Sequence, residues 1–167
     1  MLTDFHTHIF PDKMADKTIK LLESNIKEEY RPHKAELRGT LDALKQSMRE
    51  NNVDISLVLP IATNVKQSTT INNFAASING IDGIYSLGSL HPMQSDWESV
   101  LYDIKEKGLK GIKLHPEYQQ FYIDSKESIQ ILKKCEELDL ITVLHSGKDI
   151  GIDPPVHCTP ERLSHVL

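Results

Sequence analysis

The chain has 167 residues, which is enough for one ordinary domain with a hydrophobic core. Hydrophobic residues make up 39%, charged residues make up 26% and the formal net charge is −5, so we expect a soluble globular protein without a nucleic-acid-binding surface. Its apolar runs are too short to cross a bilayer and no secretory signal opens it, so we expect no membrane partner. The two cysteines, Cys135 and Cys158, form no CxxC pair and are expected to be free thiols in a reducing cytoplasm.

Short apolar runs alternate with amphipathic segments along the whole chain. Nearly continuous apolar runs predict buried strands, and apolar residues at a spacing of three or four predict helices with one buried face. Thr40 and Thr159 are of the type that caps a helix N-terminus, and Gly108 is of the type that ends a helix. In chain order, the expected elements are a strand over 2–8, a helix over 14–29, a helix from about 40, a strand over 53–61, a helix over 65–79, a strand over 83–90, a helix over 96–107, a strand over 109–114, a helix over 125–138, a strand over 140–144 and a final helix from about 160.

Five strands that alternate with helices predict an α/β fold with parallel strands and right-handed crossovers. The pattern fits either an open doubly wound sheet or a (β/α) barrel. No internal repeat, low-complexity segment or linker interrupts it. We therefore expect residues 1–167 to form a single domain.

Five of the eight histidines stand at the carboxyl ends of expected strands. Ligands bind at these ends in parallel α/β folds, so we expect the five side chains to gather at one face. They are His6, His8, His91, His115 and His145. The other three, His33, His157 and His165, have no such position, and His165 is expected at the surface or in the core.

The His6-Thr7-His8 motif places two imidazoles on the same side of one strand, together with Asp4. Two imidazoles from one strand can bind the same metal ion. His145 would add a third imidazole and leave one coordination position open for water, as in catalytic zinc sites. We therefore expect His6, His8 and His145 to bind a divalent metal, most simply zinc; the alternative is polar side chains satisfied at strand ends.

Lys113 and His115 alternate with the apolar residues Ile112 and Leu114, so both should point away from the covering helices. A buried lysine needs a partner or a lowered pKa. Lys113 could bind a substrate carboxylate or be carboxylated and bridge two metals; the alternative is a lysine that reaches bulk water or pairs with a carboxylate. We predict Lys113 and His115 as catalytic residues and His91 as a substrate-pocket residue.

Three motifs together, DFHTHIF, GIKLHP and VLHSG, resemble the amidohydrolase superfamily, and most closely its amidohydrolase-related branch, which includes decarboxylases and hydratases. The resemblance runs through essentially the whole chain. It implies a TIM barrel with a divalent metal, usually zinc, and with His6, His8 and His145 as ligands. It also implies that the metal activates a water, which attacks a C–N or C–O bond of a small-molecule substrate.

Complete members of that branch carry a further histidine on the sixth strand and an aspartate on the eighth. Eight strands and about 250 residues are typical of such a barrel. We therefore expect an incomplete TIM barrel, with about five of eight βα units and a truncated C-terminus. Asp149 and Asp153 are weak substitutes for the missing aspartate. The alternative to a fragment is a natural chain that covers its open strand edges in a homo-oligomer or with another chain.

The leading functional prediction is a metal-dependent hydrolase of the amidohydrolase type, or a related decarboxylase or hydratase. Phosphoesterases of the PHP or TatD kind also begin with DxHxH. TatD-like chains carry a GEIGLD segment where this chain has GIKLHP, and PHP members use more histidines and carboxylates. The third alternative is a non-catalytic truncated barrel that binds metal weakly or serves in assembly.

Overall fold

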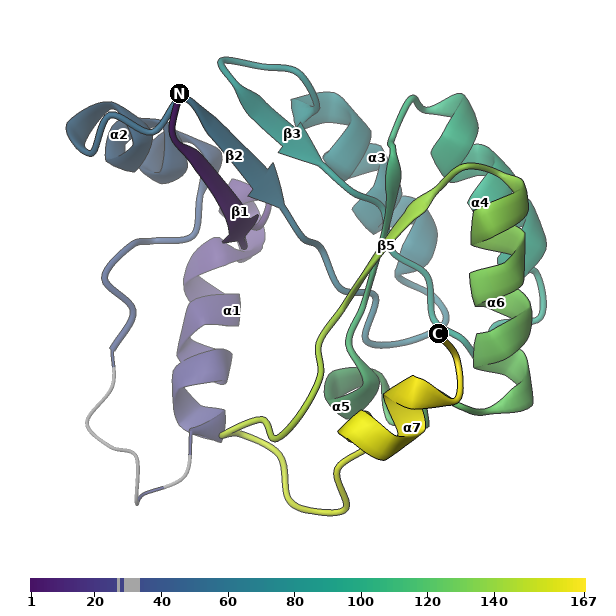
Figure 1. Ribbon diagram of the computed structural model, residues 1–167. Coiled ribbons are helices and arrows are strands. Elements are labelled where there is room, and N and C mark those ends of the chain that lie inside the picture. Colours follow the sequence, from purple (N-terminus) through teal and green to yellow (C-terminus); the bar gives the residue numbers. More distant parts are fainter. Residues whose placement is uncertain (27, 29–33) are drawn as a thin grey trace.

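The computed structural model describes residues 1–26, 28 and 34–167, and it shows parallel strands that alternate with helices (Figure 1). The strands are β1 (Thr3–Thr7), β2 (Ile55–Val58), β3 (Ile84–Ser86), β4 (Gly111–Leu114) and β5 (Ile141–Leu144). The helices are α1 (Asp12–Asn25), α2 (Leu41–Glu50), α3 (Ser68–Ile78), α4 (Trp97–Glu106), α5 (Pro116–Gln119), α6 (Lys126–Glu137) and α7 (Pro160–Ser164).

Neighbouring strands in the sheets are also neighbours in the sequence, and all of them run parallel. One sheet has the order β1-β2-β3 and the other pairs β4 with β5. Gly88 joins the two sheets, because its N–H donates to the Gly111 carbonyl and its carbonyl accepts from Lys113 N, both at 2.8 Å. The described strands therefore form one open arc of five, as expected for part of a barrel, and they do not close into one.

The expected helix starts are confirmed where a side chain caps them. The hydroxyl of Thr40 accepts from Ala43 N, and the hydroxyl of Thr159 accepts from Arg162 N. The helix expected over 65–79 begins later, at Ser68, because the preceding residues form a turn in which the Gln67 side chain accepts from Thr63 N.

Two other elements differ from expectation. The helix expected over 14–29 is α1, which begins two residues earlier, after Pro11, and ends at Asn25. Positions 27 and 29 of the expected helix lie outside the described residues, and so does His33. The four-residue helix α5 was not predicted, because one turn is too short to show a hydrophobic period.

Two hydrophobic cores lie on the two sides of the Gly88 junction. The first packs β2 and β3 against α2 and α3, with Leu44, Met48, Val58, Ile78 and Ile84 buried in it. The second packs β4 against α4 and α6, which lie together on one side of the strands in Figure 1. Its buried residues include Leu101, Ile104, Ile112, Leu114 and Ile131.

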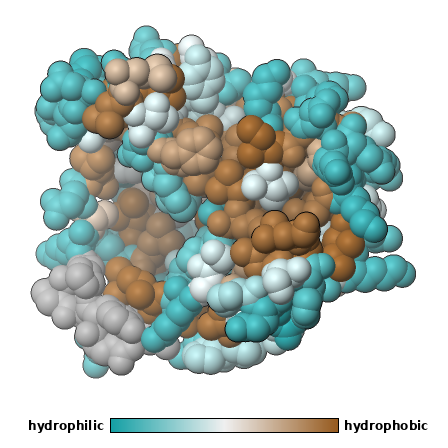
Figure 2. Space-filling model, in the orientation of Figure 1, coloured by the Kyte–Doolittle hydropathy of each residue, from teal (hydrophilic) through white to brown (hydrophobic). Residues whose placement is uncertain are grey.

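The outer edges of β1 and β5 carry no strand partner among the described residues. Phe5 on β1 and Ile141 on β5 are 58% and 57% exposed. Figure 2 shows apolar groups across the middle of one face of the molecule, with polar groups around them.

Within the described part of the chain, no helix has the length and apolar character needed to span a membrane.

Gly111 is expected to tolerate no side chain, because β4 and β5 approach closely there. A Cβ at position 111 would lie 2.1 Å from the carbonyl oxygen of Ile141, which is backbone and cannot turn away. Gly111→Ala is expected to lower the free energy of unfolding by about 3 kcal/mol or more, the upper range for overpacking. Urea denaturation would measure the loss, with exposed Lys110→Ala as control. Equal midpoints for the two variants would contradict the close approach.

Candidate metal centre

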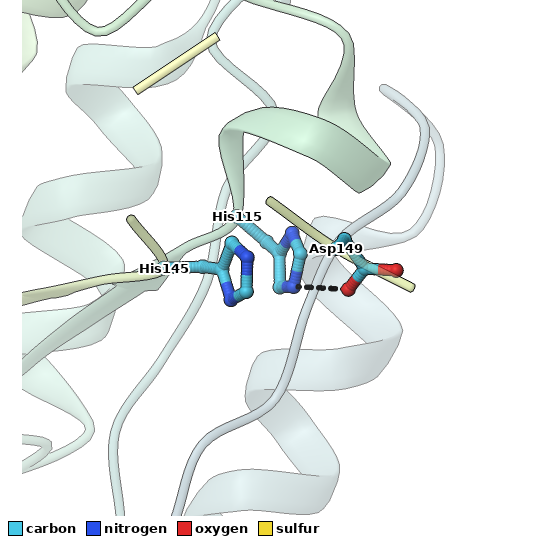
Figure 3. A group of neighbouring side chains, drawn as sticks. All are labelled: His115, His145 and Asp149. Carbon is cyan, nitrogen blue, oxygen red and sulfur yellow. Dashed lines mark ion pairs between the residues drawn. The ribbon is translucent and has the colours of Figure 1, made fainter. Parts of the chain in front are cut away.

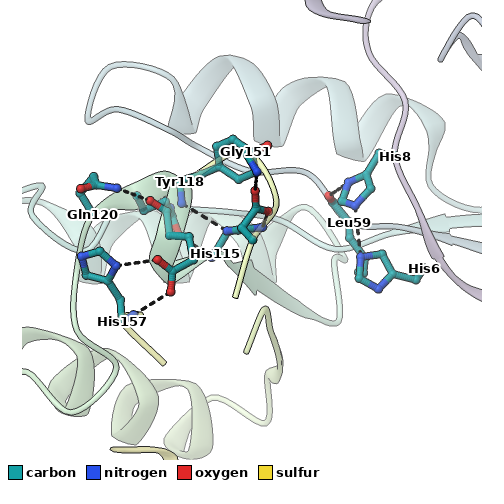
Figure 4. A network of polar contacts seen from close by, with 11 residues as sticks. His6, His8, Leu59, His115, Tyr118, Gln120, Gly151 and His157 are labelled. Atoms are coloured by element: carbon teal, nitrogen blue, oxygen red, sulfur yellow. Dashed lines mark hydrogen bonds and ion pairs between the residues drawn. The ribbon is translucent and has the colours of Figure 1, made fainter. Parts of the chain in front are cut away.

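A bulge at the end of β1 directs His6 and His8. Asp4 pairs with Ser56 but Thr7 pairs with Val58, so β1 holds one residue more than β2 over this stretch. The carboxylate of Asp4 accepts from His6 N at 3.1 Å and so fixes the backbone of the bulge. The two imidazoles converge, with 3.1 Å between the Nε2 atoms of His6 and His8 (Figure 4).

The hydrogen bond to Leu59 sets the tautomer of His8. Its Nδ1 lies 2.8 Å from the Leu59 carbonyl, which can only accept, so Nδ1 carries the hydrogen and Nε2 presents a lone pair. Two nitrogens that bind one ion at about 2.0–2.1 Å lie about 3 Å apart. The observed pair therefore fits a metal ion with little movement of either ring.

A second group of donors lies at the ends of β4 and β5. His115 and His145 stack with ring centroids 3.9 Å apart, and Asp149 Oδ2 lies 3.7 Å from His115 Nε2 (Figure 3). Ligand atoms of these three residues lie within 4.8 Å of one another. The Nε2 atom of His145 is buried and has no hydrogen-bond partner in the described structure. A bound cation would give this buried nitrogen a partner.

His115 is less suited to bind a metal than its two neighbours. Its Nδ1 caps α5 by accepting from Tyr118 N at 3.3 Å, so the neutral ring carries its hydrogen on Nε2. That Nε2–H faces Asp149 and has no free lone pair. The geometry therefore favours His145 and Asp149 as the donors of this group and gives His115 the role of orienting Asp149.

Burial favours the neutral form of the candidate imidazole ligands. Burial, with a smaller effect from the neighbouring His6, lowers the pKa of His8 to about 4. Burial also lowers the pKa values of His6 and His145, and the positive charge of Lys113 adds to this effect. Metal binding requires unprotonated imidazoles, so these rings need to release little or no proton before they bind an ion.

Lys113 lies among these histidines with no anionic partner. Its side chain is fully buried, and its Nζ has no hydrogen-bond partner within the described residues. Burial lowers its pKa to about 8, so it is mostly protonated at pH 7. Ile112 and Leu114 pack in the second core, which confirms that Lys113 points away from the covering helices. A buried, unpaired ammonium is costly and is suited to receive an anion.

His91, the predicted pocket residue, stands in the loop after β3 and makes local contacts. Its N–H donates to the Gln94 side chain, and its Nδ1 accepts from Met93 N. It is half-buried, and it is not part of either donor group. The structure thus brings together five of the six predicted site residues in two neighbouring groups, and it leaves His91 as a loop-stabilising side chain beside them.

Gln119 is a structural part of the site that the sequence pattern did not reveal. Its side-chain oxygen accepts from His115 N at 2.7 Å, and its Nε2 donates to the carbonyls of Ala62 and Leu90, both at 2.8 Å. This buried amide thereby joins the carboxyl ends of β2, β3 and β4. Its only signal in the sequence is its place three residues after GIKLHP.

The remaining predicted residues have various surroundings. Asp149 belongs to the second donor group, whereas Asp153 is exposed. His165 is at the surface, as expected, and lies 3.3 Å from an oxygen of Asp124. His157, to which no role was assigned, is buried. Both cysteines are free, as expected, and both are buried.

Comparisons with known proteins support the fold. No protein-family model and no curated protein matches the chain. An amidohydrolase II structure matches 92% of this chain and 53% of its own, with a TM-score of 0.65 and 17% identity. A manganese-bound 5-carboxyvanillate decarboxylase from Novosphingobium aromaticivorans matches 89% of this chain and 51% of its own, with a TM-score of 0.62 and 14% identity. A 2,6-dihydroxybenzoate decarboxylase from Rhizobium matches the same shares, with a TM-score of 0.59 and 14% identity.

The chain thus spans about half the length of the solved structures that it matches. Identities of 14–17% establish a likeness of fold rather than of activity. The open arc of five parallel strands and the order of its helices agree with that likeness. The resemblance read from the three motifs is confirmed at this level: the chain has the α/β fold of the amidohydrolase-related enzymes over the part of the barrel that it contains.

Proposed function

We propose that this chain forms the metal-binding part of a metal-dependent hydrolase of the amidohydrolase type, which uses metal-activated water to cleave a C–N or C–O bond of a small molecule. The observation that carries the proposal is the presence of two pairs of imidazoles, His6 with His8 and His115 with His145, at the carboxyl ends of parallel strands. Ligands bind at this end in such folds, and the likeness to amidohydrolase II supports the same reading.

His6, His8 and His145 would hold the metal, with Asp149 as a carboxylate beside His145. Three imidazoles favour zinc, and the addition of a carboxylate also suits manganese, which one of the matching decarboxylases contains. When bound, the ion would polarise a substrate carbonyl and lower the pKa of a bound water. The hydrogen bond from His8 to Leu59 would hold that ring in its ligating tautomer.

Lys113 and His115 would act on the substrate and its surroundings. The ammonium of Lys113, which lacks an anion, would attract a substrate carboxylate or a developing oxyanion and hold it beside the metal ligands. The Nε2–H of His115, 3.7 Å from Asp149 Oδ2, would attract the carboxylate without a direct hydrogen bond.

Decarboxylation is the second candidate activity, and the unpaired Lys113 ammonium favours it. A cation buried beside a metal site would hold a carboxylate-bearing substrate in a fixed orientation. Two of the matching structures are named as decarboxylases of aromatic acids, which is consistent with this assignment. Release of CO2 from hydroxybenzoates, compared with hydrolysis of lactones and amides, would separate the two activities.

The proposal is tested first by metal binding. Titration of the metal-free protein with Zn²⁺ and Mn²⁺ is expected to show saturable binding. Between pH 7.5 and pH 6 the affinity should fall less than it would for imidazoles of ordinary pKa, because burial lowers the pKa of His8 to about 4 and also lowers the pKa values of His6 and His145. A fall as steep as that of ordinary imidazoles would contradict this effect of burial.

An activity screen of the complete gene product then distinguishes the classes of function. Turnover of amides, lactones or aromatic acids with bound metal supports the proposal. Turnover of phosphate esters alone would instead assign a phosphoesterase of the PHP or TatD kind. Metal binding without turnover of any of these compounds would indicate a non-catalytic module.

A further inference from the structure

A buried carboxylate on α5 makes contacts that the proposed chemistry does not use. Glu117 is only 2% exposed, and both of its oxygens bind one residue, His157 (Figure 4). Oε1 accepts from the backbone N of His157 and Oε2 lies at Nδ1 of its ring, each at 2.7 Å. A buried carboxylate is costly unless it is fully hydrogen-bonded, so this pair strongly fixes the relative position of the two segments.

The two segments joined by this pair are those that carry His115 and Asp149. Glu117 lies two residues after His115, in the short helix that the His115 ring caps. His157 lies at the end of the segment between β5 and α7, in which Asp149 stands. The N–H of Gly147 donates to the Cys158 carbonyl at 2.9 Å, so residues 147–158 form a loop with joined ends.

The contacts within this loop leave Asp149 dependent on the loop's attachment. The Asp149 side chain accepts from Gly151 N at 2.8 Å, which is a contact inside the loop itself. Outside the loop it lies 3.7 Å from His115 Nε2, longer than a hydrogen bond, and within 4.8 Å of a ligand atom of His145. The His157–Glu117 pair links the loop to α5, and a longer bond from Ile123 N to the His157 carbonyl at 3.3 Å links it to the segment after α5.

We propose that Glu117 and His157 are positioning residues that hold the 147–158 loop against α5, so that the Asp149 carboxylate stays within reach of the metal ligands. This inference rests on the proposed function for the part that concerns metal binding. The attachment of the loop itself is independent of any metal.

Hydrogen exchange of the metal-free protein tests the attachment. Glu117→Gln keeps one acceptor oxygen and removes the charge, and amide exchange of residues 147–152 is expected to become faster by at least about 10-fold, as local opening becomes easier. Asp124→Asn is the matched control, because it removes the charge of a part-buried ion pair, with Arg162, that ties α7 to the same region. Unchanged exchange in Glu117→Gln, or equal acceleration in the control, would overturn the inference.

Titration with Mn²⁺ tests the positioning role. Glu117→Gln is expected to weaken Mn²⁺ binding by about 10- to 100-fold, the usual effect of groups that orient metal ligands. In a double variant with Asp149→Asn the affinity should be no lower than in Asp149→Asn alone, because the pair acts through Asp149. Fully additive losses would show general damage and contradict the proposal.

A second variant guards against a failure of Glu117→Gln to fold. His157→Asn removes the ring bond but keeps the backbone N–H that donates to Glu117, and the same increase in exchange is expected. If the unmodified protein binds no Mn²⁺ while both variants accelerate exchange, the proposed metal function fails and the loop attachment stands. If exchange is unchanged in both variants, the positioning inference fails whatever the metal result.

Discussion

Replacement of His6 and His8 together by alanine is expected to abolish stoichiometric binding of a divalent metal. Their Nε2 atoms converge to 3.1 Å, so the double variant removes both nitrogens that one ion would contact on β1. Since the loss of groups that merely orient ligands costs 10- to 100-fold in affinity, the loss of two ligands should cost more than about 100-fold. Metal analysis after dialysis, together with titration by Zn²⁺ and Mn²⁺, would measure the effect.

The matched control is His165→Ala, which removes an imidazole that lies at the surface and outside both donor groups. It should leave metal content unchanged. The double variant itself should remain folded, because the one hydrogen bond from His8 to Leu59 contributes about 1 kcal/mol. A folded double variant with unchanged metal content would remove His6 and His8 from the site.

Replacement of Lys113 by methionine is expected to stabilise the protein while it removes activity. Burial lowers the pKa of Lys113 from 10.5 to about 8, so the folded state holds this proton less tightly than the unfolded chain. The difference corresponds to about 3 kcal/mol of destabilisation at pH 7. Methionine fills a similar volume without the charge, so Lys113→Met should raise the free energy of unfolding at pH 7 by about that amount.

The stability of the unmodified protein is expected to rise with pH in the range where Lys113 loses its proton. Between pH 8 and pH 10.5 the unfolded chain binds the proton that the folded protein has lost, so the unmodified protein should gain stability as pH rises through this range. Lys113→Met should lack that gain, and Lys110→Met, on an exposed neighbour, should retain it. Urea denaturation of the metal-free protein at pH 7 and pH 10 would measure both effects. A less stable Lys113→Met would show that the ammonium has a partner.

The sequence predicted best those features that depend on neighbouring residues. The apolar runs located the strands, most clearly β4, which is buried along its whole length and so leaves few polar positions. Thr40 and Thr159 marked their helix starts, because a capping hydroxyl binds a backbone N–H only three residues away. Side chains two positions apart on a strand point to the same side, and this alternation correctly predicted that the rings of His6 and His8 lie together.

The sequence did not predict features that depend on contacts between residues far apart in the chain. Glu117 and His157 are 40 residues apart, and nothing in their local pattern shows that they form a buried pair. Asp149 was considered only a weak candidate, since the position of a loop residue depends on what the loop packs against. The bulge at His6 was also not predicted, because it appears only once β1 is paired with β2. The expected homo-oligomer stays a prediction.

The division of the molecule at Gly88 has a consequence for cooperativity. One core supports β1 to β3 and the other supports mainly β4 and β5, and the two sheets are joined by the backbone bonds of Gly88 and by the side chains of Ser89 and Gln119. The proposed ligands are shared in the same way, with His6 and His8 on the first part and His145 and Asp149 on the second. An ion held by both sets would be released when either part opens, so its binding free energy would favour only the state in which both are folded. With a metal bound, the two parts of the molecule would thus unfold together rather than separately.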